Sequence, residues 1–164
     1  MENSTVLIRD VQQHELPQLL ALLKAKAEFD GVANSLVATI ETLAVAIFSH
    51  KPMAKALVAV SDGSIVGMAT YYSTFSSFIA KPCLWLDDLF VDESHRSQGI
   101  GKALVTQLCR IASEHGCGRI DWVVAADNDH GQGFYSRMGA TIFETVRLAR
   151  LDESAIQALA DEEG

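Results

Sequence analysis

A glycine-rich loop in the middle of the chain has the composition of a phosphate-binding turn. The loop Arg96-Ser97-Gln98-Gly99-Ile100-Gly101 follows an apolar run and precedes residues with helical spacing. Two glycines one residue apart allow a tight turn and a close approach to a ligand, because neither carries a Cβ. The first N–H groups of the following helix, and the positive end of its dipole, attract anions. With the positive charges of Arg96 and Lys102, this stretch predicts a site for a phosphate or pyrophosphate.

Two adjacent carboxylates interrupt the apolar run that leads into this loop. Asp87 and Asp88 lie within Leu84–Val91, which is expected to form a central strand. Simple alternation along a strand would direct the two carboxylates to opposite faces of the sheet. Burial of a carboxylate without a partner is costly, so the pattern favours a chemical role for at least one of them. The alternative is that one acid caps the backbone or pairs with a neighbouring basic residue.

A third group of interest follows the first expected helix. In Glu28-Phe29-Asp30, two carboxylates flank an aromatic ring. Such a set suits an ammonium group, by charge and by cation–π contact. The alternative is that Glu28 and Asp30 are solvated charges at the end of a helix.

These residues need an α/β scaffold to position them. Apolar residues at helical spacing predict helices within 10–28, 35–48 and 100–114, and Asn128 caps a short helix that runs to Arg137. Residues 100–125 read as a helix that crosses over to a strand parallel to the central one. Asp62-Gly63 is a hairpin turn. The expected strands are 6–9, 56–60, 65–74, 84–91, 119–125 and 141–151, and a terminal helical piece covers 152–160.

Composition limits the classes of protein that this chain can be. The 164 residues suit one compact domain, 1–164, with 153–164 as a peripheral tail. A net charge of −8 argues against a nucleic-acid partner and mildly favours a cationic substrate, although an acidic surface also serves solubility. Three cysteines with no close pair and no metal-ligand spacing predict reduced thiols and no metal. With neither a secretory signal nor a membrane-spanning run, we expect a cytoplasmic protein.

Two motifs carry a family resemblance. Arg96-x-x-Gly99-x-Gly101 after a strand resembles the acyl-CoA pyrophosphate loop of the GNAT N-acetyltransferase superfamily. Downstream, Asn128-x-x-Gly131-x-x-Phe134-Tyr135 followed by Met138-Gly139-Ala140 is similar to a second segment of that family. Within the family, residues 67–72 and 86–91 most resemble the diamine (spermidine/spermine) acetyltransferase-like branch.

The resemblance implies a fold and a co-substrate. The fold is a twisted, mixed and mostly antiparallel sheet of about six or seven strands, flanked by about four helices. Its central parallel pair splays apart to admit acetyl-CoA. Backbone groups of Leu89, Phe90 and Val91 would pair with the pantetheine arm, and Asn128 would hydrogen-bond it. The N–H groups of residues 98–102 would hold the pyrophosphate.

The resemblance also implies roles for side chains. Asp87 would be the general base, directly or through water, and Asp88 would bind the amine. Tyr135 would be the general acid that protonates the departing thiolate of CoA and would contact the co-substrate. The alternative for Tyr135 is a half-buried core aromatic. Glu28, Phe29 and Asp30 would line the acceptor pocket. Ser76 and Ser77 stand where polyamine-acetylating members carry an acidic residue, which weakens the case for polyamines.

Three functions follow in order of preference. The first is acetyl transfer from acetyl-CoA to a primary amine of a small molecule, such as a diamine, a lysine-like compound or an amino acid, by direct attack in a ternary complex. The second is acetylation of a protein lysine or N-terminus. The third is a non-catalytic acyl-CoA-binding module, which Tyr135 and the strand carboxylates argue against. The resemblance also implies a homodimer, with the last strand as a possible contact.

Overall fold

The computed structural model of the protein describes residues 6–162. The chain divides into two compact units, one up to Val123 and one from Val124 onward.

A five-stranded sheet forms the centre of the first unit. Its strands are β1 (Leu7–Asp10), β2 (Lys55–Ser61), β3 (Ser64–Ser76), β4 (Lys81–Val91) and β5 (Ile120–Asp121). They lie side by side in the order of the chain. Neighbours are antiparallel except β4 and β5, which run parallel. Since parallel neighbours cannot be joined by a hairpin, the chain between them crosses over through a helix.

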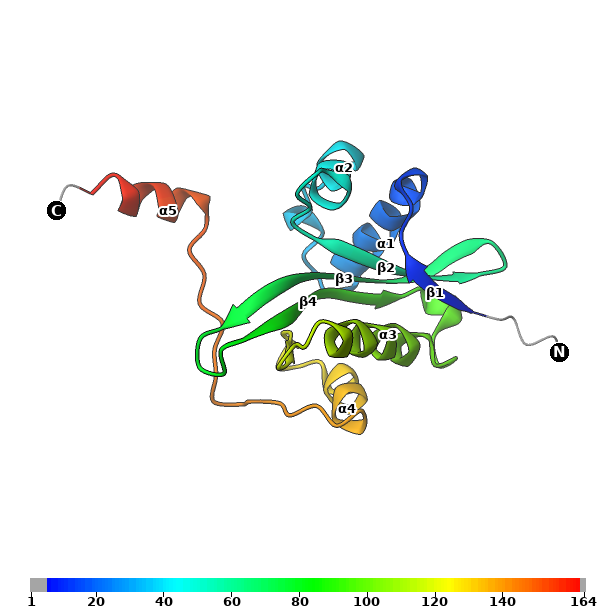
Figure 1. Cartoon of the computed structure of the whole chain (residues 1–164). Helices are drawn as coiled ribbons and strands as arrows, with labels where there is room; N and C mark the ends of the chain where they lie inside the picture. Colours follow the sequence, from blue (N-terminus) through cyan, green and yellow to red (C-terminus); the bar gives the residue numbers. More distant parts are fainter. Residues whose placement is uncertain (1–5, 163–164) are drawn as a thin grey trace. The chain divides into compact units, whose positions relative to one another are not determined.

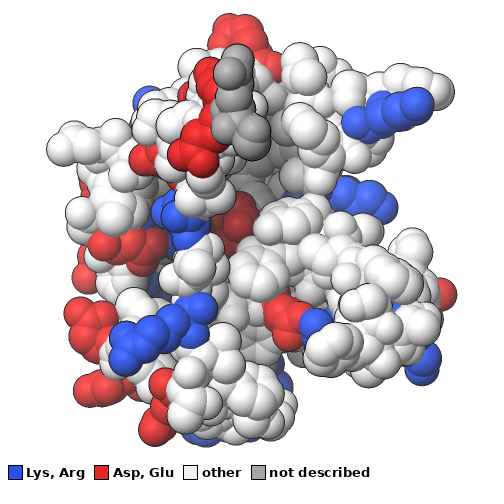
Figure 2. All heavy atoms as spheres, turned by 90° about the vertical axis from the view of Figure 1, so that its left-hand side faces the viewer, with Lys and Arg blue, Asp and Glu red and all other residues white. Residues whose placement is uncertain are grey.

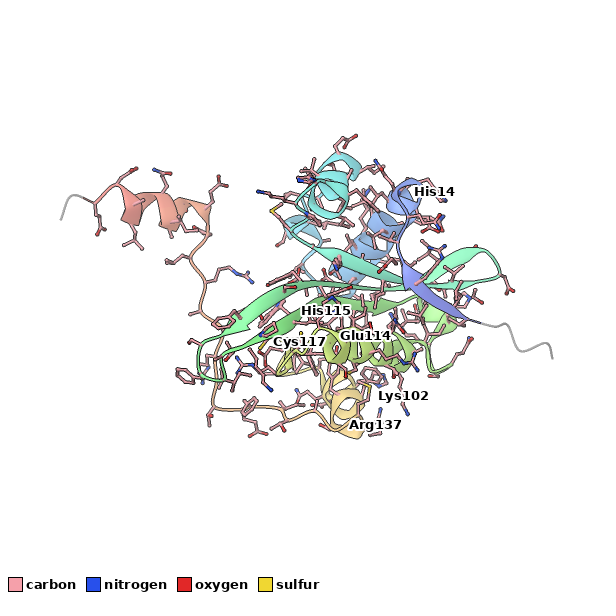
Figure 3. All side chains as sticks on the ribbon, viewed as in Figure 1. His14, Lys102, Glu114, His115, Cys117 and Arg137 are labelled. Atoms are coloured by element: carbon pink, nitrogen blue, oxygen red, sulfur yellow. The ribbon has the colours of Figure 1, made fainter. Side chains whose placement is uncertain are left out.

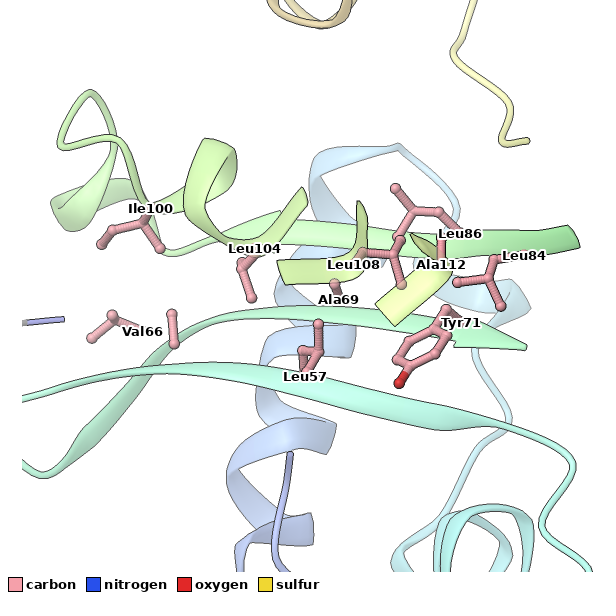
Figure 4. Close-up of a cluster of buried hydrophobic side chains, with 11 residues drawn as sticks. Leu57, Val66, Ala69, Tyr71, Leu84, Leu86, Ile100, Leu104, Leu108 and Ala112 are labelled. Carbon is pink, nitrogen blue, oxygen red and sulfur yellow. The ribbon is translucent and has the colours of Figure 1, made fainter. Parts of the chain in front are cut away.

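Helices cover both faces of this sheet (Figure 1). Helices α1 (Leu16–Phe29) and α2 (Ile40–Phe48) lie on one face, and α3 (Ile100–Glu114) lies on the other. The core is correspondingly in two layers. On the α3 side, leucine, isoleucine and alanine side chains of the helix pack on β2, β3 and β4 (Figure 4). On the α1 side, Leu16, Leu19, Leu22 and Leu23 pack on Val58, Met68 and Phe90.

A partly buried ion pair connects the first strand to the start of the first helix. A 3-10 turn, Gln13–Glu15, precedes α1. The guanidinium of Arg9 in β1 donates to both carboxylate oxygens of Glu15, at 2.8 and 2.6 Å. Glu15 also accepts from the backbone N–H of Gln12 at 2.8 Å. The Gln13–Glu15 turn that leads into α1 is therefore capped by Gln12 and Glu15, three residues apart.

The second unit contains two helices, α4 (Asp129–Arg137) and α5 (Glu153–Ala160). Each begins with a side-chain cap. The Asn128 Oδ1 accepts from the N–H of Gly131, and the Asp152 Oδ1 accepts from the N–H of Ala155, both at 2.9 Å. Residues 138–152 between them adopt no regular structure.

The expected α/β architecture and its central parallel pair are confirmed, but the strand count is lower. Five strands form among the described residues, not six or seven, and five α-helices form rather than about four. The segment 119–125 contributes only Ile120–Asp121, and 141–151 is not a strand. A β-pattern becomes a strand only where a neighbour accepts its hydrogen bonds, and neither segment finds one along its whole length. Within 6–162, no helix has the length and apolar character needed to cross a membrane.

Candidate active site

A β-bulge in the central strand sets the direction of its two carboxylates. Thr70 of β3 lies opposite Asp88, but the next residue, Tyr71, lies opposite Leu86. Asp87 is therefore the extra residue on β4, which is the arrangement of a bulge. The packing shows the shift, because Leu86 before the bulge and Leu89 after it both lie against the α3-side core.

The bulge brings both carboxylates to the α1 face of the sheet. Asp88 lies 3.5 Å from the ammonium of Lys26 on α1. Asp87 accepts from the indole N–H of Trp85 at 3.3 Å, and Trp85 alternates with the α3-facing Leu86. The expectation from simple alternation, that the two acids face opposite ways, is wrong. One inserted residue in a strand reverses the face of the sheet to which each later side chain points.

Asp88 is held from two sides. The Thr70 hydroxyl donates to one oxygen of Asp88 at 2.9 Å, and the N–H of Asp88 donates to that hydroxyl at 3.1 Å. The Lys26 ammonium pairs with the other oxygen. Asp88 therefore fits the alternative interpretation, in which one of the two acids pairs with a basic residue. Its carboxylate is fixed in place and half-buried.

Asp87 has the electrostatic surroundings of a proton acceptor. Crowding by protein atoms raises its pKa, and the negative charge of Asp88 raises it further. The hydrogen bond from Trp85 and the charge of Lys26 oppose this rise without cancelling it. Its side chain is nevertheless reached by solvent. A carboxylate with a raised pKa holds a proton more tightly than an ordinary one, and so is a better general base.

A small hollow lies between α1, the turn after it and the central strand. Its volume is about 170 Å³, and Asp30 and Asp88 both line it. Lys26 lies between them, paired with Asp30 and with Asp88. Burial lowers the pKa of Lys26, but the hydrogen bond to Asp30 and the charges of both acids outweigh that effect and raise it. The remaining lining residues are Leu23, Ala27, Val32, Ser35 and Leu36.

The predicted acceptor residues therefore do not all meet. Asp30 and Asp88 do, but Glu28 is exposed and does not line the hollow. Phe29 lies edge-on to Phe90, with ring centroids 6.3 Å apart. The guanidinium of Arg96 lies 5.0 Å from the Phe29 ring and 5.3 Å from the Phe90 ring. The cation that Phe29 contacts is thus one of the protein's own.

The glycine loop has the backbone shape of a helix-capping turn. Ser97 and Gly99 both have positive φ, +61° and +80°, and α3 begins directly afterwards. A Cβ on Gly99 would meet nothing within 4 Å, so the space beside it is open. Arg96 is directed elsewhere, since its Nε donates to the carbonyl of Val91 at 3.0 Å. This arginine ties the loop to the end of β4.

A second hollow, of about 300 Å³, begins at Gly99 and is lined by one side of α3. Lys102 and Arg110 supply two positive charges, and no acidic residue within 6–162 lines it. Lys102 lies toward the N-terminal end of α3, while Glu114 and His115 lie at its other end (Figure 3). The lining is completed by Ile8, Ala103, Thr106 and Gln107. The hollow has the charge that an anionic ligand requires.

In the second unit, the Asn128-x-x-Gly131 spacing has a structural reason. A Cβ on Gly131 would come within 2.6 Å of the Asn128 side-chain nitrogen, so a larger residue there would require the capping side chain of Asn128 to shift. Phe134 and Tyr135 follow on the helix with their rings edge to face, 5.1 Å apart. Tyr135 is half-buried.

Comparison with known proteins identifies the family. The family model described as "Acetyltransferase (GNAT) family" matches residues 19–140. The chain belongs to the GNAT acetyltransferase family. The match spans both motifs on which the resemblance rests, and it confirms that resemblance.

Several relatives of this GNAT chain carry substrate names. It is 35% identical to an L-ornithine N5-acetyltransferase from Arabidopsis thaliana over 99 residues. This alignment covers 60% of the chain and 43% of that protein. It is 25% identical to a thialysine N-epsilon-acetyltransferase from Bos taurus, over 94% of the chain and 97% of that protein. It is 29% identical to the human spermidine/spermine N(1)-acetyltransferase-like protein 1, over 81% of the chain and 20% of that protein.

Two further facts bear on these likenesses. The first curated relatives that the GNAT chain matches are longer, and it spans less than half of their length. Among solved structures, an integron cassette protein from the mobile metagenome of V. cholerae superposes with a TM-score of 0.78 at 28% identity, over 96% of this chain and 98% of that one. The GNAT fold is thereby confirmed, and the relatives named for thialysine and for spermidine/spermine confirm the resemblance to the diamine acetyltransferase-like branch.

Sequence reasoning missed three residues of this site. Lys26 could have been found, since it stands four residues before Asp30 on a helix, the spacing of an ion pair. Thr70 and Trp85 gave no such signal. Their hydrogen bonds to the two acids depend on the register of β3 and β4 and on the bulge.

Proposed function

We propose that this protein is an N-acetyltransferase that moves the acetyl group of acetyl-CoA to a primary amine of a small molecule. The observation that carries the proposal is the pair of carboxylates that the bulge turns to one face, beside an acid-lined hollow. Membership of the GNAT family and the amine substrates named for its relatives support it. The family match runs across both units, which supports one domain over 1–164.

The residues around the glycine loop fit the co-substrate. The N-terminus of α3, the open space at Gly99 and the charges of Lys102 and Arg110 suit a diphosphate. We assign the pantetheine arm to the backbone of residues 89–91 and to Asn128. When bound, acetyl-CoA supplies the activated acetyl thioester.

The two carboxylates divide the work on the amine. An alkyl amine is mostly protonated at neutral pH, so it arrives as an ammonium ion and must lose a proton before it can attack. Asp88, anchored by Thr70, holds the ammonium. Asp87 accepts the proton, directly or through one water molecule, and the freed lone pair attacks the acyl carbon. The carbon–sulfur bond of the thioester breaks, the nitrogen releases its remaining extra proton to solvent, and Tyr135 protonates the departing thiolate of CoA.

The size and charge of the hollow favour a small cationic acceptor. A volume of about 170 Å³, lined by two acids, one lysine and otherwise uncharged residues, suits an alkyl amine better than a protein chain. On the face shown in Figure 2, basic side chains stand among acidic ones and do not form a continuous band. A nucleic acid would call for such a band.

The test is turnover with a panel of amines. Purified protein is mixed with acetyl-CoA and with diamines, lysine-like amino acids, aromatic amines and lysine-containing peptides, and the released thiol is read by a colorimetric reagent. We expect release with small amines and little with peptides. Calorimetric binding of CoA without turnover of any amine would instead favour a binding module.

We also propose a cytoplasmic homodimer. The cysteines at 83, 109 and 117 are free thiols, which suits a reducing compartment. In the second unit, residues 143–159 expose several large apolar side chains, which are the usual material of an interface between copies.

A further inference from the structure

The hollow of about 170 Å³ beside α1, to which we assign the acceptor amine and which we call the acceptor hollow, is lined by a cationic side chain of the protein itself. Lys26 projects from α1 and pairs with Asp30 and Asp88, the two acids that line the hollow. Its side chain is only 21% exposed, and those of Asp30 and Asp88 are 37% and 26% exposed. Charges in such a partly desolvated group act on one another more strongly than charges in water.

The lining leaves one negative charge to be matched. Among the residues that the structure describes, two carboxylates and one ammonium line the hollow, and the other lining residues are uncharged. Asp87 also carries a negative charge when it acts as the base, but it lies outside the lining, so this count is of the groups that line the hollow. One acceptor ammonium completes an alternating ring of charges with Asp30, Lys26 and Asp88, whereas a second ammonium would meet Lys26 with like charge.

We propose that Lys26 is an internal counterion that restricts the acceptor pocket to amines whose net charge is +1. This deepens the proposed function and rests on it. The favoured class comprises monoamines and amino acids with a side-chain amine, since an α-carboxylate cancels one of the two ammonium charges. Diamines, at +2, and polyamines, at +3 or more, are disfavoured even though the pocket is acidic.

Three acceptor amines of equal chain length separate the effect of net charge from the effect of a carboxylate. Lysine and pentylamine each carry a net charge of +1, with and without a carboxylate, and cadaverine carries +2. We expect the wild type to acetylate lysine and pentylamine with a higher kcat/KM than cadaverine. A preference for lysine alone would overturn the proposal, because Lys26 would then be reading the carboxylate and not the net charge.

Substitutions at the ring of charges should move this preference in opposite directions. Lys26→Met leaves the pocket more negative, so the ratio of kcat/KM for cadaverine to that for pentylamine should rise about tenfold or more. Asp30→Asn leaves it less negative, so the same ratio should fall. Lys26→Arg keeps the charge and should keep the wild-type ratio. Lys24→Met is the matched control, because Lys24 is exposed on the same helix and does not line the hollow.

The outcomes distinguish this inference from the function on which it rests. Circular dichroism establishes that each variant is folded, and should Lys26→Met not fold, the Asp30→Asn and Lys26→Arg arms still decide. An unmoved ratio in the folded charge variants, or an equal loss with all three acceptors, overturns the role of Lys26 and leaves the acetyltransferase proposal standing. Absence of turnover by the wild type with every amine overturns the proposed function itself.

Discussion

At the scale of single residues, the two neighbouring aspartates have different surroundings, and we expect them to do different work. Asp88 is fixed by a hydroxyl and an ammonium, while Asp87 is reached by solvent and has a raised pKa. A general base works only when deprotonated, so the rate should rise as the pH rises through that raised pKa. Asp87→Asn should lower kcat by on the order of a hundredfold and flatten the rise. Rate against pH at saturating amine checks this.

Asp88→Asn is the comparison for that variant. It should mainly raise the KM of the amine, because it removes the ammonium partner. It should also move the rise of rate to lower pH, because the charge of Asp88 no longer raises the pKa of Asp87. An unaltered pH profile in Asp87→Asn would mean that the base is another group.

Tyr135 can be tested separately from the acids. If it protonates the leaving group, Tyr135→Phe should lower kcat by on the order of ten- to a thousandfold. Acetyl-CoA affinity, measured by calorimetry, should change little, because the ring remains. Phe134→Leu on the same helix is the control for packing. Full turnover in Tyr135→Phe would leave the tyrosine only the role of a half-buried aromatic.

The sequence was enough to single out these residues but not to orient them. Asp87 and Asp88 stood out because acids are rare in an apolar strand. Their common facing depends on one extra residue in β4 relative to β3, and register is a property of two strands that no single stretch encodes. Arg96 was likewise expected at the phosphate, because a single stretch of sequence does not show where a side chain points. In the structure its guanidinium lies against Phe29 and Phe90.

At the scale of elements, the ion pair between β1 and the start of α1 should make stability depend on pH. The Arg9 guanidinium lowers the pKa of Glu15 from 4.5 to about 2. The carboxylate therefore stabilises the fold fully above the unfolded pKa and loses that effect as the pH falls through the folded pKa. Glu15→Gln should cost about 2 kcal/mol at pH 7 and progressively less from pH 4.5 to pH 2.

Thermal melts of wild type and variant across that pH range measure the difference. Glu114→Gln is the matched control, because Glu114 is exposed at the end of α3 and should change Tm little at any pH. A constant difference between wild type and Glu15→Gln from pH 7 to pH 2 would show that packing, and not charge, is what Glu15 contributes.

The glycine loop can be tested against a turn of the same conformation. Gly99 and Gly63 have nearly equal φ, +80° and +78°, and a Cβ on either would meet nothing within 4 Å. Alanine at each position should therefore cost a similar 1–2 kcal/mol or so of backbone strain. Only Gly99→Ala should also weaken CoA binding, and Gly99→Val should abolish it, because the added atoms fill space beside the helix N-terminus. Equal CoA affinity in Gly63→Ala and Gly99→Val would refute the loop assignment.

Helices and strands were predicted well where the local sequence pattern determines them, and poorly where a neighbouring strand is also needed. Helices α1, α3 and α4 follow from apolar spacing and caps. The segment 141–151 has the composition of a strand yet is irregular, because strand formation needs a neighbouring edge as well as a sequence.

At the scale of the whole molecule, that same segment bears on assembly. Phe143, Val146 and Leu148 are 68%, 70% and 63% exposed, and apolar side chains persist into α5 at Ile156 and Leu159. Since water is a poor environment for so many apolar groups in one segment, we expect a second copy of the chain to cover them. Light scattering during size-exclusion chromatography should give twice the mass of one chain.

Charge placed within the apolar segment should separate the two copies. Phe143→Asp with Val146→Asp should shift the mass to that of one chain, because burial of two carboxylates without partners costs more than the contact returns. Met53→Asp with Val37→Asp alters two apolar residues of the first unit that are at least as exposed, and should leave the dimer intact. If the 143/146 variant stays dimeric while the 37/53 variant dissociates, the interface lies on the first unit, around α2. The acceptor hollow, whose lining includes Val32, Ser35 and Leu36, would then be close to the partner copy.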